Sequence, residues 1–361
     1  MSDILRPELL WIEGRCYRLN DSNTEVSALQ EHDLYENETV FKDLGDDDSD
    51  DNFEVTEIAS DRYCTSLHVS KHYIGSIIGK KGIMKSRIER DTRTNIKIPK
   101  QAESGDITIL GPSITNIKAA RRRINIIVMS LRMKQKSTHF ISIPLNESVI
   151  MNNFECFKQK VLHQFSSKGV EESLFIRANK LHITIGVMCL MDNEERIQAS
   201  KLLAEANEKI LKPLFSNHFP LRVRVKGLSY MNDDPKNIDV LYGCVEDEDS
   251  STGIIQKVAD VLVDYFNKAG FMDNKEYYRD NVKLHVTLMN SKYRDKSYTD
   301  NEVASNKRNV RQTFDGTDIL NQFAEYDFGV TEIKTIHLSQ RKSTGADGYY
   351  QPTFVVPLKI N

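Results

Sequence analysis

The chain contains only five cysteines and one tryptophan, and it has no long apolar run. The cysteines lie far apart and form no C-x-x-C pair, which argues against a zinc cluster or a disulfide framework. The first residues lack the basic-then-apolar order of a secretory signal, and no apolar stretch is long enough to cross a bilayer. These absences predict an intracellular protein without a membrane span, and the length of 361 residues predicts two or three domains.

The net charge of −3 conceals opposite charges in neighbouring segments. Residues 31–57 carry twelve Asp and Glu against one Lys, whereas residues 58–137 carry seventeen Lys and Arg against five Asp and Glu, a net charge of +12. A segment as acidic as the first resists burial and is predicted to be a disordered linker. The basic segment is a candidate binder of a polyanion.

The first twenty residues hold an apolar cluster that includes Trp11 and Tyr17. One interpretation is a strand or arm that packs on the protein's own body, and the other is a peptide anchor for a partner protein. We treat residues 1–57 as an N-terminal arm followed by the acidic linker.

Residues 58–137 are predicted to fold in the order β-α-α-β-β-α. The last helix begins after Gly111-Pro112, with Ser113 as its N-cap, and repeats apolar residues at helical spacing. The expected elements are a strand at 63–69, helices at 71–78 and 83–91, strands at 94–98 and 106–110, and the long final helix.

The segment Gly79-Lys80-Lys81-Gly82 is predicted to connect the two short helices. The glycines let the backbone approach a sugar-phosphate chain without a Cβ atom in the way, and Lys80 and Lys81 can neutralise phosphate. With its aliphatic flanks and element order, the segment resembles the G-x-x-G loop of a type I K-homology (KH) domain, which implies binding of single-stranded RNA. The alternative is a KH scaffold used for protein contacts; the paired lysines argue against it.

A pentapeptide is repeated in the second part of the chain: K-L-H-I-T at 180–184 recurs as K-L-H-V-T at 283–287, 103 residues later. Alternate side chains of a strand share a face, so the His and Thr of each copy face away from the aliphatic residues. Similarly spaced strands at 140–145 and 240–245, each followed by a helical stripe, precede the two copies. This predicts an internal duplication within one two-lobed domain, residues 138–361.

The four polar residues of the repeat, His182, Thr184, His285 and Thr287, resemble the paired His-x-Thr motifs of the 2H phosphoesterase superfamily. Its members include LigT-like RNA phosphodiesterases and the nucleotide-binding domain of an A-kinase anchoring protein. The chemistry needs two imidazoles on opposite sides of one phosphate, one as base and the other as acid, with the threonines donating hydrogen bonds to non-bridging oxygens. No metal or other cofactor is required. The alternative is two histidines that satisfy only the hydrogen bonds of their own sheet.

The predicted fold is therefore α+β: a type I KH domain is followed directly by a two-lobed, pseudo-two-fold LigT-like domain. The short junction at 134–138 predicts that the last KH helix packs against the second domain.

Three details of the second domain are also expected. A helix is capped by Asp192 and ends before Pro213. A single additional strand covers residues 330–340. A charged insertion at 291–312 either borders the cleft or is a solvated loop.

A chain that combines both domains resembles a family of subunits of a transcription-coactivator complex. The resemblance implies a nuclear protein that works with helicase and ubiquitin-binding subunits in transcriptional coactivation and in repair of alkylation damage. Two functions stay open: a metal-independent phosphodiesterase acting on an RNA phosphodiester or 2′,3′-cyclic phosphate, or a module that holds a nucleotide or RNA end without turnover. The intact His-x-Thr pair favours the first, and the anchoring-protein resemblance favours the second.

Overall fold

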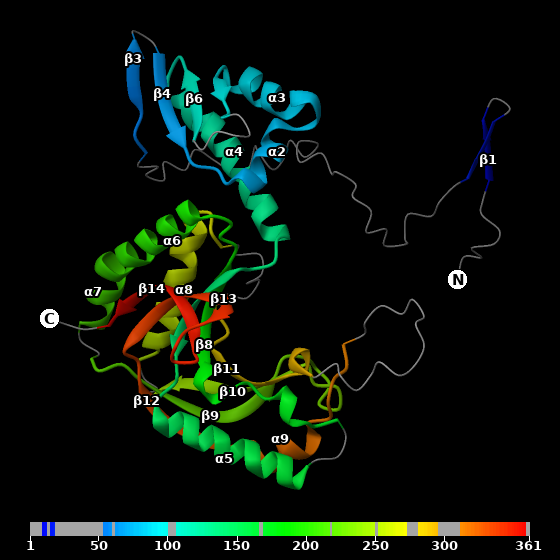
Figure 1. The fold of residues 1–361 in the computed structure, drawn as a ribbon, viewed down its shortest axis with the longest axis vertical. Coiled ribbons are helices and arrows are strands. Elements are labelled where there is room, and N and C mark those ends of the chain that lie inside the picture. Colours follow the sequence, from blue (N-terminus) through cyan, green and yellow to red (C-terminus); the bar gives the residue numbers. More distant parts are fainter. Residues whose placement is uncertain are drawn as a thin grey trace. The chain divides into compact units, whose positions relative to one another are not determined.

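The computed structural model divides into two units, residues 1–53 and 54–361 (Figure 1). In the first unit, strands β1 (Leu9–Ile12) and β2 (Arg15–Arg18) pair antiparallel. The side chains of the apolar cluster and the acidic tract expected to form a linker lie outside the described residues. The structure describes residues 9–12, 15–18, 53–59, 62–99, 106–165, 169–216, 219–249, 252–272, 281–294 and 311–358. Within these ranges, no helix has the length and apolar character that a membrane span requires.

The KH part of the second unit is a four-stranded antiparallel sheet in the order β3-β4-β6-β5, with three helices. The predicted β-α-α-β-β-α order is confirmed, and Ser113 Oγ accepts the Asn116 N–H at 3.2 Å as the predicted N-cap. Strand β3 was not predicted; it pairs with β4 at the edge of the sheet. The elements are β3 (Thr56–Ala59), β4 (Arg62–Leu67), α2 (Lys71–Ile78), α3 (Ile83–Thr92), β5 (Asn95–Lys97), β6 (Ile107–Gly111) and α4 (Ile114–Lys134).

The KH core forms from one face of the sheet and the inner faces of the helices. Aliphatic burial of this kind supplies most of the stability of short helices, which are marginal alone. The expected stripe on α4 is buried over its middle, but Ile114 at its start is 45% exposed. The buried side chains of this core include Tyr73, Ile77, Ile88, Ile96, Ile107, Ile109, Ile117 and Ile124.

The larger domain is built on an eight-stranded antiparallel sheet in the order β12-β9-β10-β11-β8-β7-β13-β14. Strands β8 and β11, which carry the two copies of the repeat, are adjacent at its centre, as expected for a pseudo-two-fold arrangement. The strands are β7 (His139–Pro144), β8 (His182–Met188), β9 (Arg222–Tyr230), β10 (Val240–Asp247), β11 (His285–Asn290), β12 (Asp327–Glu332), β13 (Thr335–Thr344) and β14 (Tyr350–Pro357).

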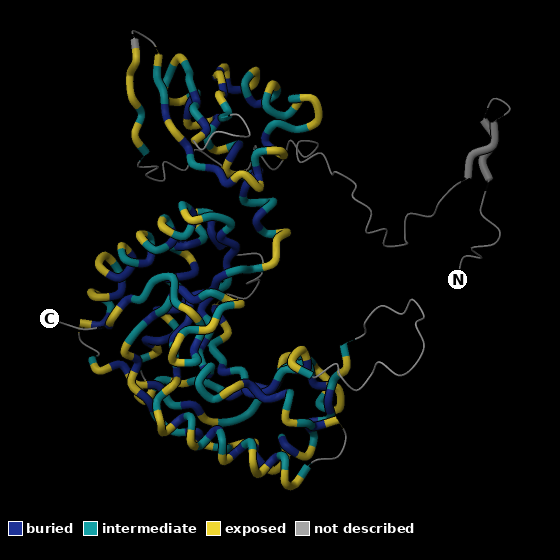
Figure 2. The backbone as a smooth tube through the Cα atoms, in the orientation of Figure 1, coloured by how far each residue is buried: buried dark blue, intermediate teal, exposed yellow. Residues whose placement is uncertain are grey.

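Helices pack on this sheet and share one continuous apolar core with it. Figure 2 shows buried residues along the strands and on the inner sides of the helices. The predicted stripes are confirmed: Phe154, Phe157 and Val161 of α5 and Val258 and Leu262 of α8 are buried. The helices are α5 (Ser148–Gln164), α6 (Asn193–Ala206), α7 (Lys212–Phe215), α8 (Ile254–Lys268) and α9 (Thr317–Phe323).

Two expectations about this domain are wrong. The helix capped by Asp192 continues through Pro213 to Phe215, by way of a π-helical turn at Asn207–Leu211. Proline has no backbone N–H to donate, and the wider π-helical turn tolerates the missing hydrogen bond. The single strand expected at 330–340 is divided between β12 and β13, which lie on opposite sides of the sheet centre. Local sequence shows the extended conformation but not the change of position within the sheet.

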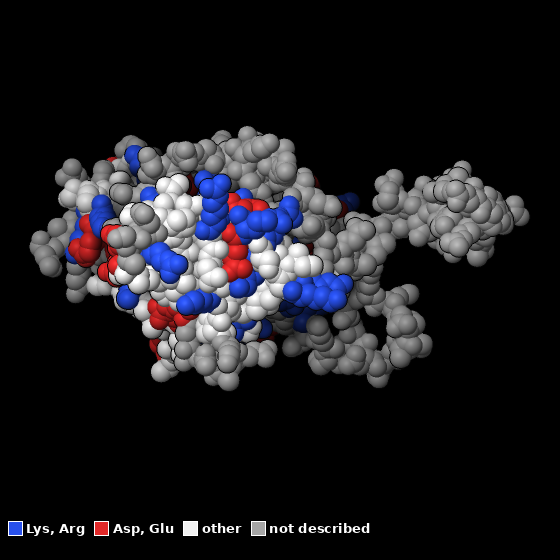
Figure 3. Space-filling model, turned by 90° about the horizontal axis from the view of Figure 1, so that it is seen from above, with Lys and Arg blue, Asp and Glu red and all other residues white. Residues whose placement is uncertain are grey.

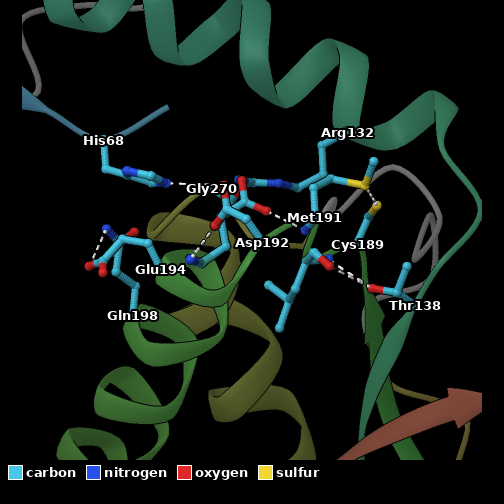
Figure 4. Close-up of polar contacts among 11 residues, drawn as sticks. His68, Arg132, Thr138, Cys189, Met191, Asp192, Glu194, Gln198 and Gly270 are labelled. Carbon is cyan, nitrogen blue, oxygen red and sulfur yellow. Dashed lines mark hydrogen bonds and ion pairs between the residues drawn. The ribbon is translucent and has the colours of Figure 1, made fainter. Parts of the chain in front are cut away.

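The last turn of α4 packs against the larger domain (Figure 4). Arg132 Nη2 donates to Glu195 Oε1 at 2.7 Å, and Nη1 donates to the carbonyl of Gly270. A second contact joins His68 Nε2, in the segment between β4 and α2, to Asp192 Oδ2 at 3.1 Å. The predicted packing of the last KH helix on the second domain is confirmed.

Candidate nucleic-acid-binding loop and two-histidine site

The glycine loop joins α2 to α3 in a conformation that depends on both glycines. Gly79 has φ 69° and ψ 178°, and a Cβ atom there would lie only 2.7 Å from Met84 Cβ. Gly82 has φ 81° and open space around it, so only its backbone conformation requires glycine. Lys81 is also left-handed, with φ 53°. The loop therefore turns sharply and presents its backbone, as approach to a phosphate chain requires.

Lys80 and Lys81 are exposed, and neither makes an ion pair with any described residue. Elsewhere in the domain some cations are paired, as Arg123 is with Asp91 at 2.8 Å. Figure 3, which looks down on the KH end, shows Lys and Arg side chains around a smaller group of acidic ones. The two loop lysines are thus free to meet an external anion.

The repeated motifs meet at the centre of the larger sheet. Val286 of β11 is the cross-strand partner of Ile183 of β8, and the two strands are antiparallel. Continuing this register by one residue in each direction places each histidine opposite the threonine of the other copy. The four side chains are partly exposed on one face, which we call the histidine face, while Ile183 and Val286 are buried on the other. The histidine face comprises His182, Thr184, His285 and Thr287.

Each histidine is oriented by the backbone two residues before it. His182 Nδ1 lies 2.7 Å from the carbonyl oxygen of Lys180, and His285 Nδ1 lies 2.8 Å from that of Lys283. A carbonyl oxygen only accepts, so both Nδ1 atoms carry a proton. Each Nε2, which makes no hydrogen bond with a described residue, is then the atom left for chemistry.

The imidazolium form of each of these histidines loses its proton at a lower pH than that of an ordinary histidine. Burial, with the charge of His285 as a smaller cause, lowers the pKa of His182 to about 4. Burial also lowers the pKa of His285, and the Lys283 ammonium adds to this effect. Both rings are therefore neutral at pH 7 in the free protein. Proton donation by either one requires a bound anion that raises its pKa.

Aromatic rings support both histidines. The ring centroids of His182 and Tyr350 are 5.3 Å apart, and the two rings are nearly perpendicular. The ring centroids of His285 and Tyr242 are also 5.3 Å apart. Sequence reasoning did not single out either tyrosine. Tyr242 had a signal, since it lies on the strand expected at 240–245. Tyr350 had none, because the return of β14 along the sheet brings it to His182.

Two further histidines of the domain have purely internal partners. Buried His139 places Nδ1 2.8 Å from Thr138 Oγ1, and His337 Nε2 lies 2.9 Å from Thr335 Oγ1. The histidines of the histidine face differ, because each keeps an Nε2 atom that makes no hydrogen bond with a described residue. Across the described ranges, no group of three or more His, Cys, Asp or Glu is arranged to hold a metal.

The flanks of the charged insertion are anchored, while residues 295–310 lie outside the described residues. Arg294 and Arg311 each pair with a carboxylate of a neighbouring loop, at 3.3 Å and 2.9 Å. Tyr293, just before this segment, interacts with Tyr350 and so approaches the ring that supports His182. This flank borders the two-histidine site.

A G-x-x-G loop in a KH fold, followed by a sheet with paired His-x-Thr strands at its centre, defines a KH protein with a LigT-like domain. The KH domain family model matches residues 64–126, and the model for the AKAP7 2′5′ RNA ligase-like domain matches residues 137–358. The chain is 32% identical to a Mus musculus protein, "Activating signal cointegrator 1 complex subunit 1", over 96% of this chain and 97% of that one. The chain belongs to the family of activating signal cointegrator 1 complex subunit 1.

Solved structures match each domain separately. The first type I KH domain of human vigilin is 23% identical, with 24% of this chain and 90% of that one covered, at a TM-score of 0.20. Escherichia coli LigT, solved with NADP+, is 14% identical, with 62% and 96% covered, at a TM-score of 0.31. A crystal structure titled as a phosphoesterase is 13% identical, with the same coverage, at a TM-score of 0.30.

Proposed function

We propose that this protein binds single-stranded RNA through the Gly79–Gly82 loop and acts on an RNA phosphodiester or 2′,3′-cyclic phosphate at the histidine face. The observation that carries the proposal is that His182 and His285 lie on adjacent strands with matching Nδ1 hydrogen bonds to the backbone, which leave each Nε2 without a hydrogen bond to a described residue. One RNA strand would run from the loop to this face.

The proposed reaction uses one neutral imidazole and one imidazolium. The neutral ring removes a proton from water, whose oxygen forms a bond to phosphorus. The ester oxygen on the other side leaves and takes the proton of the imidazolium. Thr184 and Thr287 donate hydrogen bonds to the non-bridging oxygens, where negative charge develops. The bound phosphate supplies the anion that lets one of the two rings become protonated.

A second function is favoured because burial lowers the pKa of both histidines. Because neither ring is protonated at pH 7 in the free protein, the face can act as a binding site that holds a nucleotide or an RNA end without turnover. Both functions use the same four side chains, and they differ only in whether a ring acquires its proton in the complex.

A single-turnover assay with an oligoribonucleotide ending in a 2′,3′-cyclic phosphate separates the two functions. If the protein is an enzyme, the wild-type chain should open the cyclic phosphate. Either His182→Ala or His285→Ala should lower the rate about 10²- to 10⁴-fold, and the double variant should be little slower than each single variant. His163→Ala on the exposed side of α5 is the matched control and should retain the rate. Binding by the wild type without turnover of cyclic or linear RNA identifies the binding module.

We also propose that the protein is a nuclear subunit of a coactivator and alkylation-repair complex, in contact with helicase and ubiquitin-binding subunits. The family relationship supports this assignment. Affinity purification of the tagged chain from nuclear extract, followed by mass spectrometry, tests it. Recovery of neither type of subunit would contradict the proposal.

A further inference from the structure

Both copies of the repeat place a lysine over the tyrosine that supports the histidine. Lys180 Nζ lies 4.8 Å from the ring centroid of Tyr350, and Lys283 Nζ lies 4.9 Å from that of Tyr242. Each lysine also supplies the carbonyl oxygen that accepts from its histidine. A cation over an aromatic face is held by the electron density of the ring, which keeps its direction defined while its N–H groups stay available.

The two lysines differ in what else they contact. Lys180 Nζ donates to Thr344 Oγ1 at 2.9 Å. Partial burial, with the charge of Arg177 as a smaller cause, lowers the pKa of the Lys180 ammonium. Lys283 is exposed, and its ammonium makes no hydrogen bond or ion pair with the described part of the chain. Of the two lysines, Lys283 is therefore the one whose ammonium N–H groups are available to a ligand.

The position of Tyr242 puts Lys283 on the histidine face. Tyr242 is the cross-strand partner of Thr287, so their side chains share a face of the sheet. The tyrosine is fixed in turn, because its hydroxyl donates to Ser229 Oγ at 3.0 Å. In the other lobe the register partner of Thr184 is the small Ser142, and the tyrosine there comes from β14 instead.

We propose that Lys283 is the phosphate-binding lysine of the two-histidine site: its ammonium, seated over Tyr242, binds an anionic oxygen of the ligand phosphate and places that phosphate against His285. This inference rests on the proposed function, since it names the group that recruits the phosphate to the same face. Lys180, the symmetry-related lysine, is a structural residue that ties its loop to Thr344.

The charged surroundings of His285 agree with this role. Lys283 and the facing His182 lie near the ring, and Cys244 is its cross-strand partner. Burial is the main cause that raises the pKa of Cys244, and the negative charges of Glu325 and Glu246 raise it further. In the free protein the Lys283 ammonium lowers the pKa of His285; once a phosphate binds the ammonium, its negative charge opposes that effect and favours the imidazolium needed for acid catalysis.

The test compares Lys283→Met with Lys180→Met, a matched pair in which each lysine loses its charge but keeps most of its apolar stem. Uridine 3′-monophosphate is titrated into the full chain labelled with ¹³C-histidine, and the ring signals of His182 and His285 report binding and pH midpoints without requiring turnover. The signals are assigned from the two single His→Ala variants, and thermal unfolding confirms that each lysine variant is folded.

We expect Lys283→Met to weaken binding of the nucleotide about three- to ten-fold, as for loss of one exposed charge-assisted contact, and to move the His285 midpoint to higher pH. Lys283→Arg should retain binding. Lys180→Met should change neither quantity. Equal binding by wild type and Lys283→Met, or equal losses in the two Met variants, overturns the assignment of Lys283. A wild-type protein that binds no nucleotide, with its histidine signals unmoved, instead overturns the proposed function of the site.

Discussion

Replacing Arg132 with methionine should strongly destabilise the junction between the KH domain and the larger domain. The side chains of Arg132 and Glu195 are 9% and 4% exposed, and their charged atoms are 2.7 Å apart. Glu195 also accepts the backbone N–H of Met191 at 2.6 Å, which keeps the carboxylate in place after the guanidinium is lost. Methionine fills most of the apolar volume, so the main effect is a buried carboxylate without its cation.

Removing one partner of such a buried pair costs about 3–5 kcal/mol, against at most about 1 kcal/mol for an exposed pair. For a folded unit of this size, the loss corresponds to a decrease of about 6–10 °C in Tm, at about 2 °C for each kcal/mol. Adding Glu195→Gln to Arg132→Met removes the stranded charge but keeps an acceptor for Met191. The double variant should therefore be more stable than Arg132→Met alone.

Thermal and urea unfolding by circular dichroism measure the loss, and hydrogen exchange in residues 189–195 and 268–272 locates it at the junction. Lys209→Met breaks an exposed i,i+4 pair with Glu205 and serves as the control, with an expected change below about 0.5 kcal/mol. The burial argument is refuted if Arg132→Met stays within about 1 kcal/mol of wild type, or if Glu195→Gln destabilises it further.

Three other outcomes are expected. Replacing Lys80 and Lys81 with Asp should weaken binding of single-stranded RNA and flatten the dependence of log affinity on log salt by about 1.4, since each lost phosphate contact contributes about 0.7; an unchanged slope in a folded variant would place the RNA elsewhere. Gly79→Ala should destabilise the KH domain by at least about 1–3 kcal/mol in a melting experiment, because of its backbone conformation and the approach of Met84, and a neutral result would contradict the loop geometry. If the protein is an enzyme, kcat/KM should be bell-shaped with its maximum below pH 6.5 rather than near neutrality, because burial lowers both histidine pKa values and the rate falls as the required imidazolium is lost; a maximum above pH 7.5 would contradict this.

Local features of the sequence determined the parts of this protein that depend on near neighbours. Ser113 caps its helix because the cap bonds to an amide three residues on. The backbone conformation of Gly79, with φ 69° and ψ 178°, favours glycine irrespective of its neighbours. The repeated pentapeptide fixed which side chains share a strand face, since alternation is a property of the strand itself. It also contained both lysines, although the pattern could not distinguish Lys283 from its counterpart.

Only the tertiary structure decided which distant residues meet. Tyr350 reaches His182 because β14 returns along β13, a pairing set by the packing of the whole sheet. The stretch at 330–340 is divided between β12 and β13, which lie in opposite halves of that sheet, and nothing in its sequence marks the division. Arg132 resembles an ordinary surface cation of a basic helix, yet it is buried because Glu195 is available across the junction to pair with it. The sequence sets each residue's conformational preference and charge, whereas burial and pKa depend on neighbours that arrive from elsewhere in the chain.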